Sequence, residues 1–248
     1  MNFFKKIFSA PDPAIAADLS VIGVDMHSHF IPGIDDGAKT MEDSLTLLRG
    51  MQELGYRKVI TTPHVMSDFF RNTPEIILGG LEKVRAAATA GGIDLDIQAA
   101  AEYYDDFELD KKIDNEKLLT FGENYLLFEV SYLNEPNNVN NLIFKLRTSG
   151  YKPVLAHPER YPFWYKRLDV FESLKEKGVL LQLNINSLTG HYSPDAQKVA
   201  EYLIDKNMVD FLGSDCHHAG HLQLMQKAVR TKALHKLLAS GSLRNTQL

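Results

Sequence analysis

Histidine and carboxylate side chains recur in short motifs that are far apart in the sequence. In the segment 25–29, which reads DMHSH, the two histidines are two positions apart. Residues with this spacing in an extended segment point to the same side, so His27 and His29 can bind one metal ion together. Asp215 and His217 have the same spacing. An isolated His-x-His pair is more often structural, so the metal interpretation depends on the other motifs.

Further metal-capable side chains accompany apolar segments in the same way. His64 follows an apolar segment and a proline, and His157 directly follows another apolar segment. Glu102 comes after three alanines, and Glu129 lies inside an apolar run. A carboxylate in such a setting must be paired with a cation, either a metal ion or a nearby arginine or lysine. Asp36 lies in a turn-rich loop, where it can either reach a metal ion or serve as an ordinary turn residue.

These motifs supply five histidines and four carboxylates. The nine candidate ligands are His27, His29, Asp36, His64, Glu102, Glu129, His157, Asp215 and His217. Mixed nitrogen and oxygen ligands without thiolate suit manganese, iron or zinc. Three divalent ions would exceed the charge of the four carboxylates, and that surplus would attract a phosphate dianion and favour deprotonation of a bridging water. Charge alone does not determine the number of ions.

The segments that must position these residues alternate between two patterns. Seven short, mostly apolar runs are predicted strands: Val21–Met26, Lys58–Thr62, Asp96–Ala101, Tyr125–Val130, Lys152–Ala156, Leu180–Asn184 and Asp210–Ser214. Periodic apolar residues predict helices over Met41–Leu54, Pro74–Ala90, Val139–Thr148, Leu168–Lys177, Pro194–Lys206 and Leu224–Leu238. Strands that alternate with helices indicate a parallel sheet with right-handed crossovers.

Six of the seven predicted strands deliver a metal-capable side chain at the same carboxyl end. A barrel gathers such residues at one mouth, whereas an open doubly wound sheet concentrates them near one switch point. We therefore predict an α/β fold in the form of a distorted seven-stranded (β/α)7 barrel. The open sheet is the alternative.

Composition excludes several classes of protein. The 248 residues include 27 Lys and Arg against 32 Asp and Glu, a net charge of −5, so we expect no nucleic-acid partner. The single cysteine, Cys216, excludes an internal disulfide framework and predicts a reducing, cytoplasmic location. No apolar run approaches the ~20 residues of a transmembrane helix.

We expect one catalytic domain over residues 21–248 and an N-terminal tail over residues 1–20 that is surface-packed or flexible. Residues 3–8 combine phenylalanines, an isoleucine and two lysines. Because interfacial anchors use such residues, a weak contact of the tail with a membrane surface is a further possibility.

Six motifs, in order along the chain, resemble those of one protein family. They are His27-Ser28-His29, Pro32-Gly33-Ile34-Asp35-Asp36-Gly37, Thr62-Pro63-His64, Ala101-Glu102-Tyr103-Tyr104, His157-Pro158-Glu159-Arg160-Tyr161 and Ser214-Asp215-Cys216-His217. This set resembles the PHP (polymerase and histidinol phosphatase) superfamily. Within it, the motifs resemble the bacterial manganese-dependent protein-tyrosine phosphatases that are found with capsule and exopolysaccharide synthesis genes. The resemblance implies a distorted barrel and a phosphotyrosine-containing protein substrate, with a bacterial tyrosine autokinase as the expected partner.

The resemblance also implies a three-ion Mn²⁺ centre, with iron, zinc or magnesium as alternatives. In it, one ion is held by His27, His29, Glu102 and Asp215. Glu102 bridges to a second ion, which Glu129 and His157 share, and a third ion is held by Asp36, His64 and His217.

Arg160 matches a phosphate-binding arginine of the family. The family usually has another arginine shortly after the last motif, but this chain has none there. That contact is either missing or supplied by His221 or His218. Aromatic residues around the expected mouth could form a slot for a phosphotyrosyl ring or could simply pack in loops. From these we expect Arg160, Tyr161, Phe70 and Arg71 to contact the substrate, and Arg160 and His221 to act in catalysis.

The implied reaction is hydrolysis of a phosphate monoester, in which a metal-bridging hydroxide attacks phosphorus in line and Arg160 neutralises charge on the phosphoryl oxygens. A cysteine-based mechanism needs an arginine six positions after the nucleophile, but Leu222 occupies that position relative to Cys216. Two alternatives stay open. One is a PHP phosphoesterase for a small molecule such as histidinol phosphate, and the other is a non-catalytic, metal-bound docking module.

Overall fold

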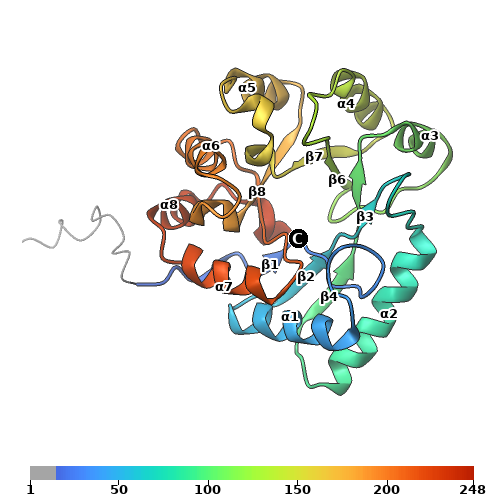
Figure 1. Cartoon of the computed structure of the whole chain (residues 1–248), viewed down its shortest axis with the longest axis vertical. Coiled ribbons are helices and arrows are strands. Elements are labelled where there is room, and N and C mark those ends of the chain that lie inside the picture. Colours follow the sequence, from blue (N-terminus) through green and yellow to red (C-terminus); the bar gives the residue numbers. More distant parts are fainter. Residues whose placement is uncertain (1–14) are drawn as a thin grey trace, which may run out of the picture.

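A computed structural model describes residues 15–248 of the chain, with strands at the centre and helices around them (Figure 1). The described part of the predicted tail packs on the rest of the molecule. The N–H of Ala17 donates to the carbonyl oxygen of Val229 at 2.7 Å, and Leu19 is buried. The predicted membrane contact of residues 3–8 lies outside the described residues. None of the helices described in residues 15–248 is long and apolar enough to cross a membrane.

The strands form two sheets in which every strand pair is parallel. The strands are β1 (Val24–Asp25), β2 (Lys58–Thr61), β3 (His64–Val65), β4 (Asp96–Ala99), β5 (Glu102–Tyr104), β6 (Tyr125–Glu129), β7 (Lys152–Ala156), β8 (Leu180–Asn184) and β9 (Phe211–Gly213). The smaller sheet has the order β1-β2-β4, and the larger has the order β3-β5-β6-β7-β8-β9. The predicted α/β class with parallel strands is therefore confirmed.

Two predicted strands are each followed by a second short strand, so the described residues contain nine short strands instead of the seven expected. Pro63 separates β2 from β3, because proline has no N–H to donate to a neighbouring strand. The break between β4 and β5 lies at the same level, since Thr61 pairs with Ala99 and His64 pairs with Glu102. Both breaks transfer the chain from the smaller sheet to the larger one.

The first and last strands meet just beyond their carboxyl ends. Ser28 and Cys216 form an isolated parallel bridge. The N–H of Asp215 donates to the carbonyl oxygen of His27 at 2.8 Å, and the N–H of His29 donates to that of Cys216 at 3.1 Å. These contacts bring residues from opposite ends of the sequence to one place.

Eight α-helices are described around the sheets. They are α1 (Met41–Glu53), α2 (Pro74–Ala90), α3 (Phe107–Asn115), α4 (Val139–Thr148), α5 (Asp169–Glu176), α6 (Pro194–Asp205), α7 (Ala219–Ala228) and α8 (Lys232–Ser240). Helix α1 begins with a capping box between Thr40 and Asp43. The single helix predicted over Leu224–Leu238 is wrong. Two helices occupy this region, and α8 starts anew at Thr231, whose side chain caps it.

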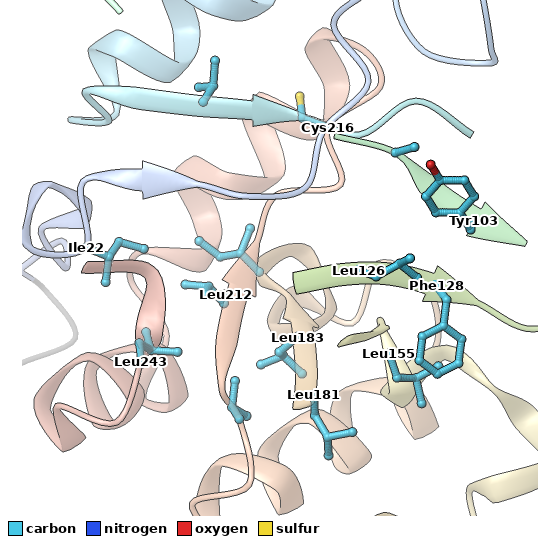
Figure 2. Close-up of a cluster of buried hydrophobic side chains, with 14 of the residues drawn as sticks. Ile22, Tyr103, Leu126, Phe128, Leu155, Leu181, Leu183, Leu212, Cys216 and Leu243 are labelled. Carbon is cyan, nitrogen blue, oxygen red and sulfur yellow. The ribbon is translucent and has the colours of Figure 1, made fainter. Parts of the chain in front are cut away.

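The central strands are buried on both faces, as their continuous apolar sequences predict. In β6, Leu126 and Phe128 belong to the large core cluster beneath the helices, and Figure 2 shows them beside Leu155. Leu127, between them, belongs to a second cluster that includes Val154 of β7. Because both faces are filled by apolar side chains, polar groups are concentrated where the strands end.

Candidate metal centre

The nine ligands predicted from the sequence converge at the carboxyl ends of the strands. They fall into four overlapping groups, within each of which the potential ligand atoms all lie within 4.8 Å of one another. The groups are His29, Asp36, His64 and His217; His27, His29 and Asp215; His27, Glu102 and His157; and His64, Glu102 and Glu129. The groups share members, so the arrangement could hold several ions close together.

Glu102 lies at the middle of this centre and is fully buried. Its Oε2 atom is 3.1 Å from Nε2 of His27 and 3.2 Å from Nδ1 of His64, and its Oε1 atom is 3.0 Å from Nε2 of His157. Burial by itself would raise the pKa of the Glu102 carboxyl. The charges of His27 and His64 outweigh that effect and hold the pKa well below its usual range. A buried carboxylate that faces three imidazoles suits a bridging ligand.

Asp36 joins two histidines at the solvent side of the centre. Its Oδ1 atom is 3.4 Å from Nε2 of His64 and 3.3 Å from Nε2 of His217. Partial burial would raise the pKa of Asp36, but the hydrogen bond and charge of His217 and the charge of His64 lower it to about 2. The carboxylate is therefore ionised and available to a cation at neutral pH.

Asp215 presents its two carboxylate oxygens to different partners. Oδ1 lies 3.5 Å from Nε2 of His27 and 3.4 Å from Nε2 of His29. Oδ2 accepts hydrogen bonds from Arg160 Nη1 at 2.8 Å and from Asn184 Nδ2 at 2.6 Å. Asp215 can thus bind a metal ion through one oxygen and orient Arg160 through the other.

Three of the histidines have hydrogen-bond partners on their ring nitrogens. His27 donates to Oε1 of Gln182 at 2.8 Å, and His29 donates to Oδ2 of Asp35 at 2.8 Å. The hydroxyl of Tyr132 lies 3.1 Å from Nδ1 and 3.3 Å from Nε2 of His157. Partners on Nδ1, as in His27 and His29, fix the ring orientation of metal-binding histidines and leave Nε2 for the ion.

The sequence interpretation missed Gln182 and Tyr132 and treated Asp35 as a turn residue. A signal for Gln182 was present, because it is a buried polar residue in the otherwise apolar start of β8. Tyr132 carried no comparable signal, since tyrosines are common in loops.

One buried nitrogen atom fits a missing cation. Nδ1 of His64 makes no hydrogen bond within the described part of the chain, although carboxylate oxygens of Glu129 and Glu102 lie 3.0 and 3.2 Å away. Burying such an atom without a partner is unfavourable. An imidazole nitrogen beside two carboxylates is an arrangement that a shared divalent cation would satisfy.

The centre opens into a pocket of about 340 Å³. Its lining includes Asp36, His64, Glu129, Tyr132, His157, Arg160, Tyr192, Asp215, His217, His218 and His221. The predicted phosphate ligand, Arg160, therefore faces the same space as the predicted metal ligands. So do His218 and His221, the two candidates for the missing arginine. The Nδ1 atom of His221 is 3.0 Å from the carbonyl oxygen of Asp215.

Of the predicted substrate contacts, Arg160 faces the pocket, whereas Tyr161 lies in the core. Tyr161 is fully buried, and its hydroxyl accepts from the N–H of Val130 and donates to Ala156, so its prediction as a substrate contact needs correction. A 3-10 helix over Pro158–Arg160 turns the chain at this point, which directs Arg160 to the pocket and the next side chain into the core.

Phe70 and Arg71 lie on different sides of their loop. The ring of Phe70 stacks on His64 with centroids 5.6 Å apart, at the edge of the centre. Arg71 instead lines a separate cavity of about 450 Å³, and its Nε donates to the carbonyl oxygen of Ser67. Arg71 is therefore not among the described residues that line the pocket, and its contact with a protein substrate stays a prediction.

Cys216 is unsuited to nucleophilic attack. It is fully buried, and burial raises the pKa of its thiol well above the usual value. The thiol therefore stays protonated at neutral pH, in agreement with the prediction that this is not a cysteine-based site.

A family model described as capsular polysaccharide synthesis, CpsB/CapC, matches residues 23–238. The chain belongs to this family. Tyrosine-protein phosphatase YwqE from Bacillus subtilis (strain 168) is 28% identical over 196 residues, which cover 79% of this chain and 77% of YwqE. Tyrosine-protein phosphatase CpsB from Streptococcus pneumoniae is 27% identical over 201 residues, which cover 79% of this chain and 83% of that protein.

Solved structures agree with this CpsB/CapC assignment. A chain from the crystal structures of YwqE and S. pneumoniae CpsB, described as unique metal-dependent tyrosine phosphatases, matches with a TM-score of 0.76 and 26% identity over 83% of this chain and 85% of that chain. Histidinol phosphate phosphatase from Lactococcus lactis subsp. lactis shares the fold, with a TM-score of 0.51 and 14% identity over 83% of this chain and 93% of that chain. The resemblance stated from the motifs is thereby confirmed.

Proposed function

We propose that this chain is a metal-dependent protein-tyrosine phosphatase that hydrolyses phosphotyrosine in proteins. The convergence of nine metal-capable side chains on one pocket, with Arg160 in its wall, is the observation that carries this proposal. The names of the CpsB/CapC relatives support it, because they are tyrosine-protein phosphatases of similar length.

We propose a three-ion Mn²⁺ centre in which the nine residues act as ligands. Divalent ions bound there would supply Lewis acidity and an activated water. The ligand sets follow the resemblance: His27, His29, Glu102 and Asp215 for one ion; Glu102, Glu129 and His157 for the second; Asp36, His64 and His217 for the third. The group of His27, His29 and Asp215 and the group that includes Asp36, His64 and His217 support the first and third sets. For the second set, Glu102 is grouped with His157 and, separately, with Glu129.

The remaining residues would act on the substrate. Arg160 binds the phosphoryl oxygens and neutralises charge that develops on them. Phe70 borders the phosphotyrosyl ring, and His221 makes a second polar contact in the pocket. The phenol of tyrosine has a pKa of about 10, so the phenolate can leave the phosphoryl group without protonation by a strong general acid.

The wider setting of the enzyme also belongs to the proposal. We place it in the cytoplasm, acting on a tyrosine autokinase of polysaccharide synthesis. The family description, capsular polysaccharide synthesis, supports the polysaccharide setting. We also propose that the two sheets together make a distorted PHP-type barrel, because Ser28 and Cys216 connect the first strand to the last.

Metal analysis combined with turnover tests the function. The purified protein is assayed with p-nitrophenyl phosphate, a phosphotyrosyl peptide and histidinol phosphate, before and after chelation and after addition of Mn²⁺. We expect bound metal, turnover of both aryl phosphates and loss of activity on chelation. A clear preference for histidinol phosphate would indicate a small-molecule phosphoesterase. Bound metal without turnover would indicate a docking module.

A further inference from the structure

Arg160 is the one arginine or lysine among the described residues that line the pocket. Its guanidinium carbon lies 4.1 Å from the ring centroid of Tyr192 and 4.9 Å from that of Tyr132. Both tyrosines also line the pocket. The one arginine in the described lining of the pocket is therefore in contact with two aromatic rings.

We propose that Tyr132 and Tyr192 are positioning residues that hold the guanidinium of Arg160 in place for the phosphoryl group. The proposal rests on the proposed function and adds two residues to that site. Neither tyrosine belongs to any of the six sequence motifs.

The tyrosines reach Arg160 from two separate loops. Tyr132 follows β6, and Tyr192 lies between the 3-10 helix Ile185–Thr189 and α6. Arg160 is the last residue of the 3-10 helix Pro158–Arg160, which follows β7. In the larger sheet, β7 lies between β6 and β8, the strands that precede the two loops. Two independently anchored rings restrict a long, flexible side chain more than either ring alone.

The hydrogen bonds of Arg160 leave part of its guanidinium available. A guanidinium carries five N–H donors. Nη1 donates to Oδ2 of Asp215, which also accepts from Asn184. Stacking on aromatic rings uses the faces of the guanidinium and leaves its in-plane donors free. The side chain keeps 23% of its surface exposed, so the donors not used by Asp215 can meet a phosphoryl group in the pocket.

The two tyrosines differ in what their hydroxyl groups do. The Tyr132 hydroxyl lies 3.1 Å from Nδ1 of His157, so this residue also orients a predicted metal ligand. The Tyr192 hydroxyl accepts a longer hydrogen bond, at 3.4 Å, from Nδ2 of Asn184. Substitution by phenylalanine keeps the ring and removes the hydroxyl, which separates these roles.

The test compares Tyr192→Leu with Tyr192→Phe in the metal-loaded protein. Calorimetric titration measures the Kd of inorganic phosphate, and steady-state kinetics measure KM and kcat for p-nitrophenyl phosphate. We expect the leucine variant to raise the phosphate Kd and KM by about threefold to tenfold, the range of a partly desolvated cation–π contact. The phenylalanine variant should stay within about twofold of wild type, because it keeps the ring face.

Tyr202→Leu is the matched control. Tyr202 lies on α6, where its ring is 5.8 Å from Nζ of Lys206, and it is not among the described residues that line the pocket. We expect this variant to keep the wild-type phosphate Kd and KM. Tyr132→Phe removes the hydroxyl that lies beside His157 and should lower metal content. Tyr132→Leu should lower metal content and also raise the phosphate Kd when the two variants are compared at equal metal content.

Equal phosphate affinities for Tyr192→Leu, Tyr192→Phe and wild type would overturn the proposal. Unchanged phosphate binding in Arg160→Ala would also overturn it, since the tyrosines would then hold a side chain that does not bind phosphate. A weakening of the same size in both Tyr192 variants would also overturn it, since the hydroxyl would then be responsible. Failure of the proposed function looks different, because wild type would bind phosphate without hydrolysing any aryl phosphate.

Discussion

Asp25 accepts two hydrogen bonds from Ser214, a residue 189 positions later in the chain. The backbone N–H of Ser214 donates to Oδ1 at 2.8 Å, and its hydroxyl donates to Oδ2 at 2.9 Å. Both residues are fully buried. The pair joins the end of β1 to the segment that follows β9, directly beside the predicted ligands His27 and Asp215.

Ser214→Ala should lower the free energy of unfolding by about 2 kcal/mol, because the buried Asp25 carboxylate loses a donor that nothing replaces. Chemical denaturation of the metal-free protein measures the change. Ser149→Ala, at an exposed position after α4, is the control and should change stability by less than about 0.5 kcal/mol. Equal stabilities for the two variants would show that the Asp25–Ser214 contact contributes nothing.

Glu102→Gln should reduce metal content and lower kcat at least about a hundredfold, because the centre loses the negative charge that faces three histidines. Elemental analysis and turnover of p-nitrophenyl phosphate measure both quantities. Glu123→Gln, an exposed carboxylate paired with Lys152, should leave both unchanged. We expect His157→Ala to behave like Glu102→Gln, with the fold retained by circular dichroism. A near wild-type rate in either site variant would refute the ligand assignment.

Cys216→Ser should keep at least about half of the wild-type turnover, because the buried thiol is protonated and contributes packing rather than a nucleophile. Kinetics with p-nitrophenyl phosphate and a metal determination measure the outcome. Loss of turnover with the metals still bound would mean that the thiol takes part in the reaction.

His221→Ala should lower kcat/KM about tenfold and His218→Ala by less, about twofold. Both rings line the pocket, but His221 is buried against the Asp215 carbonyl oxygen, whereas His218 is exposed at the start of α7. Loss of His221 removes a pocket contact and also a partner of Asp215. The reverse order of effects would assign the second phosphate contact to His218.

Asp105→Asn should raise the free energy of unfolding by about 1 kcal/mol at pH 8, a value reduced to allow for the partial exposure of the side chain. The substitution should have no effect on that free energy below about pH 4. Burial and the charges of Asp106 and Asp110 raise the pKa of Asp105 from 3.8 to about 6. The protonated carboxyl of Asp105 therefore stabilises the folded state. This contribution to the free energy of unfolding is lost as the pH rises through about 6.

Denaturation of metal-free protein at pH 4 and pH 8 measures this dependence. Asp94→Asn, at an exposed position, should show no comparable difference between the two pH values. If Asp105→Asn is destabilising at pH 8, the carboxylate has a favourable partner and the prediction is wrong.

The metal-capable residues could be predicted because each one interrupts or follows an apolar segment. Glu102 after three alanines and His64 after Pro63 stand out by residue type alone, and parallel strands must bring such positions to one edge. Helix α1 could be predicted from its periodic apolar residues.

Features that depend on the local path of the backbone could not be predicted in this way. Tyr161 follows Arg160 in the sequence, yet a 3-10 helix directs the two side chains to different environments. Helix α3 is short and rich in charge, and its start depends on Asp106 as the cap. Tyr192 contacts Arg160 because a loop folds over the strand ends, which no periodic pattern records.

The junction between the beginning and the end of the sequence has a consequence for synthesis on the ribosome. Domains generally fold as units while a protein is being synthesised. His27 and His29 emerge early, but Asp215 reaches them after nearly the whole sequence has been made, since Ser214 is 189 positions beyond Asp25. A nascent or prematurely terminated polypeptide therefore lacks a complete centre, so unfinished molecules are catalytically silent.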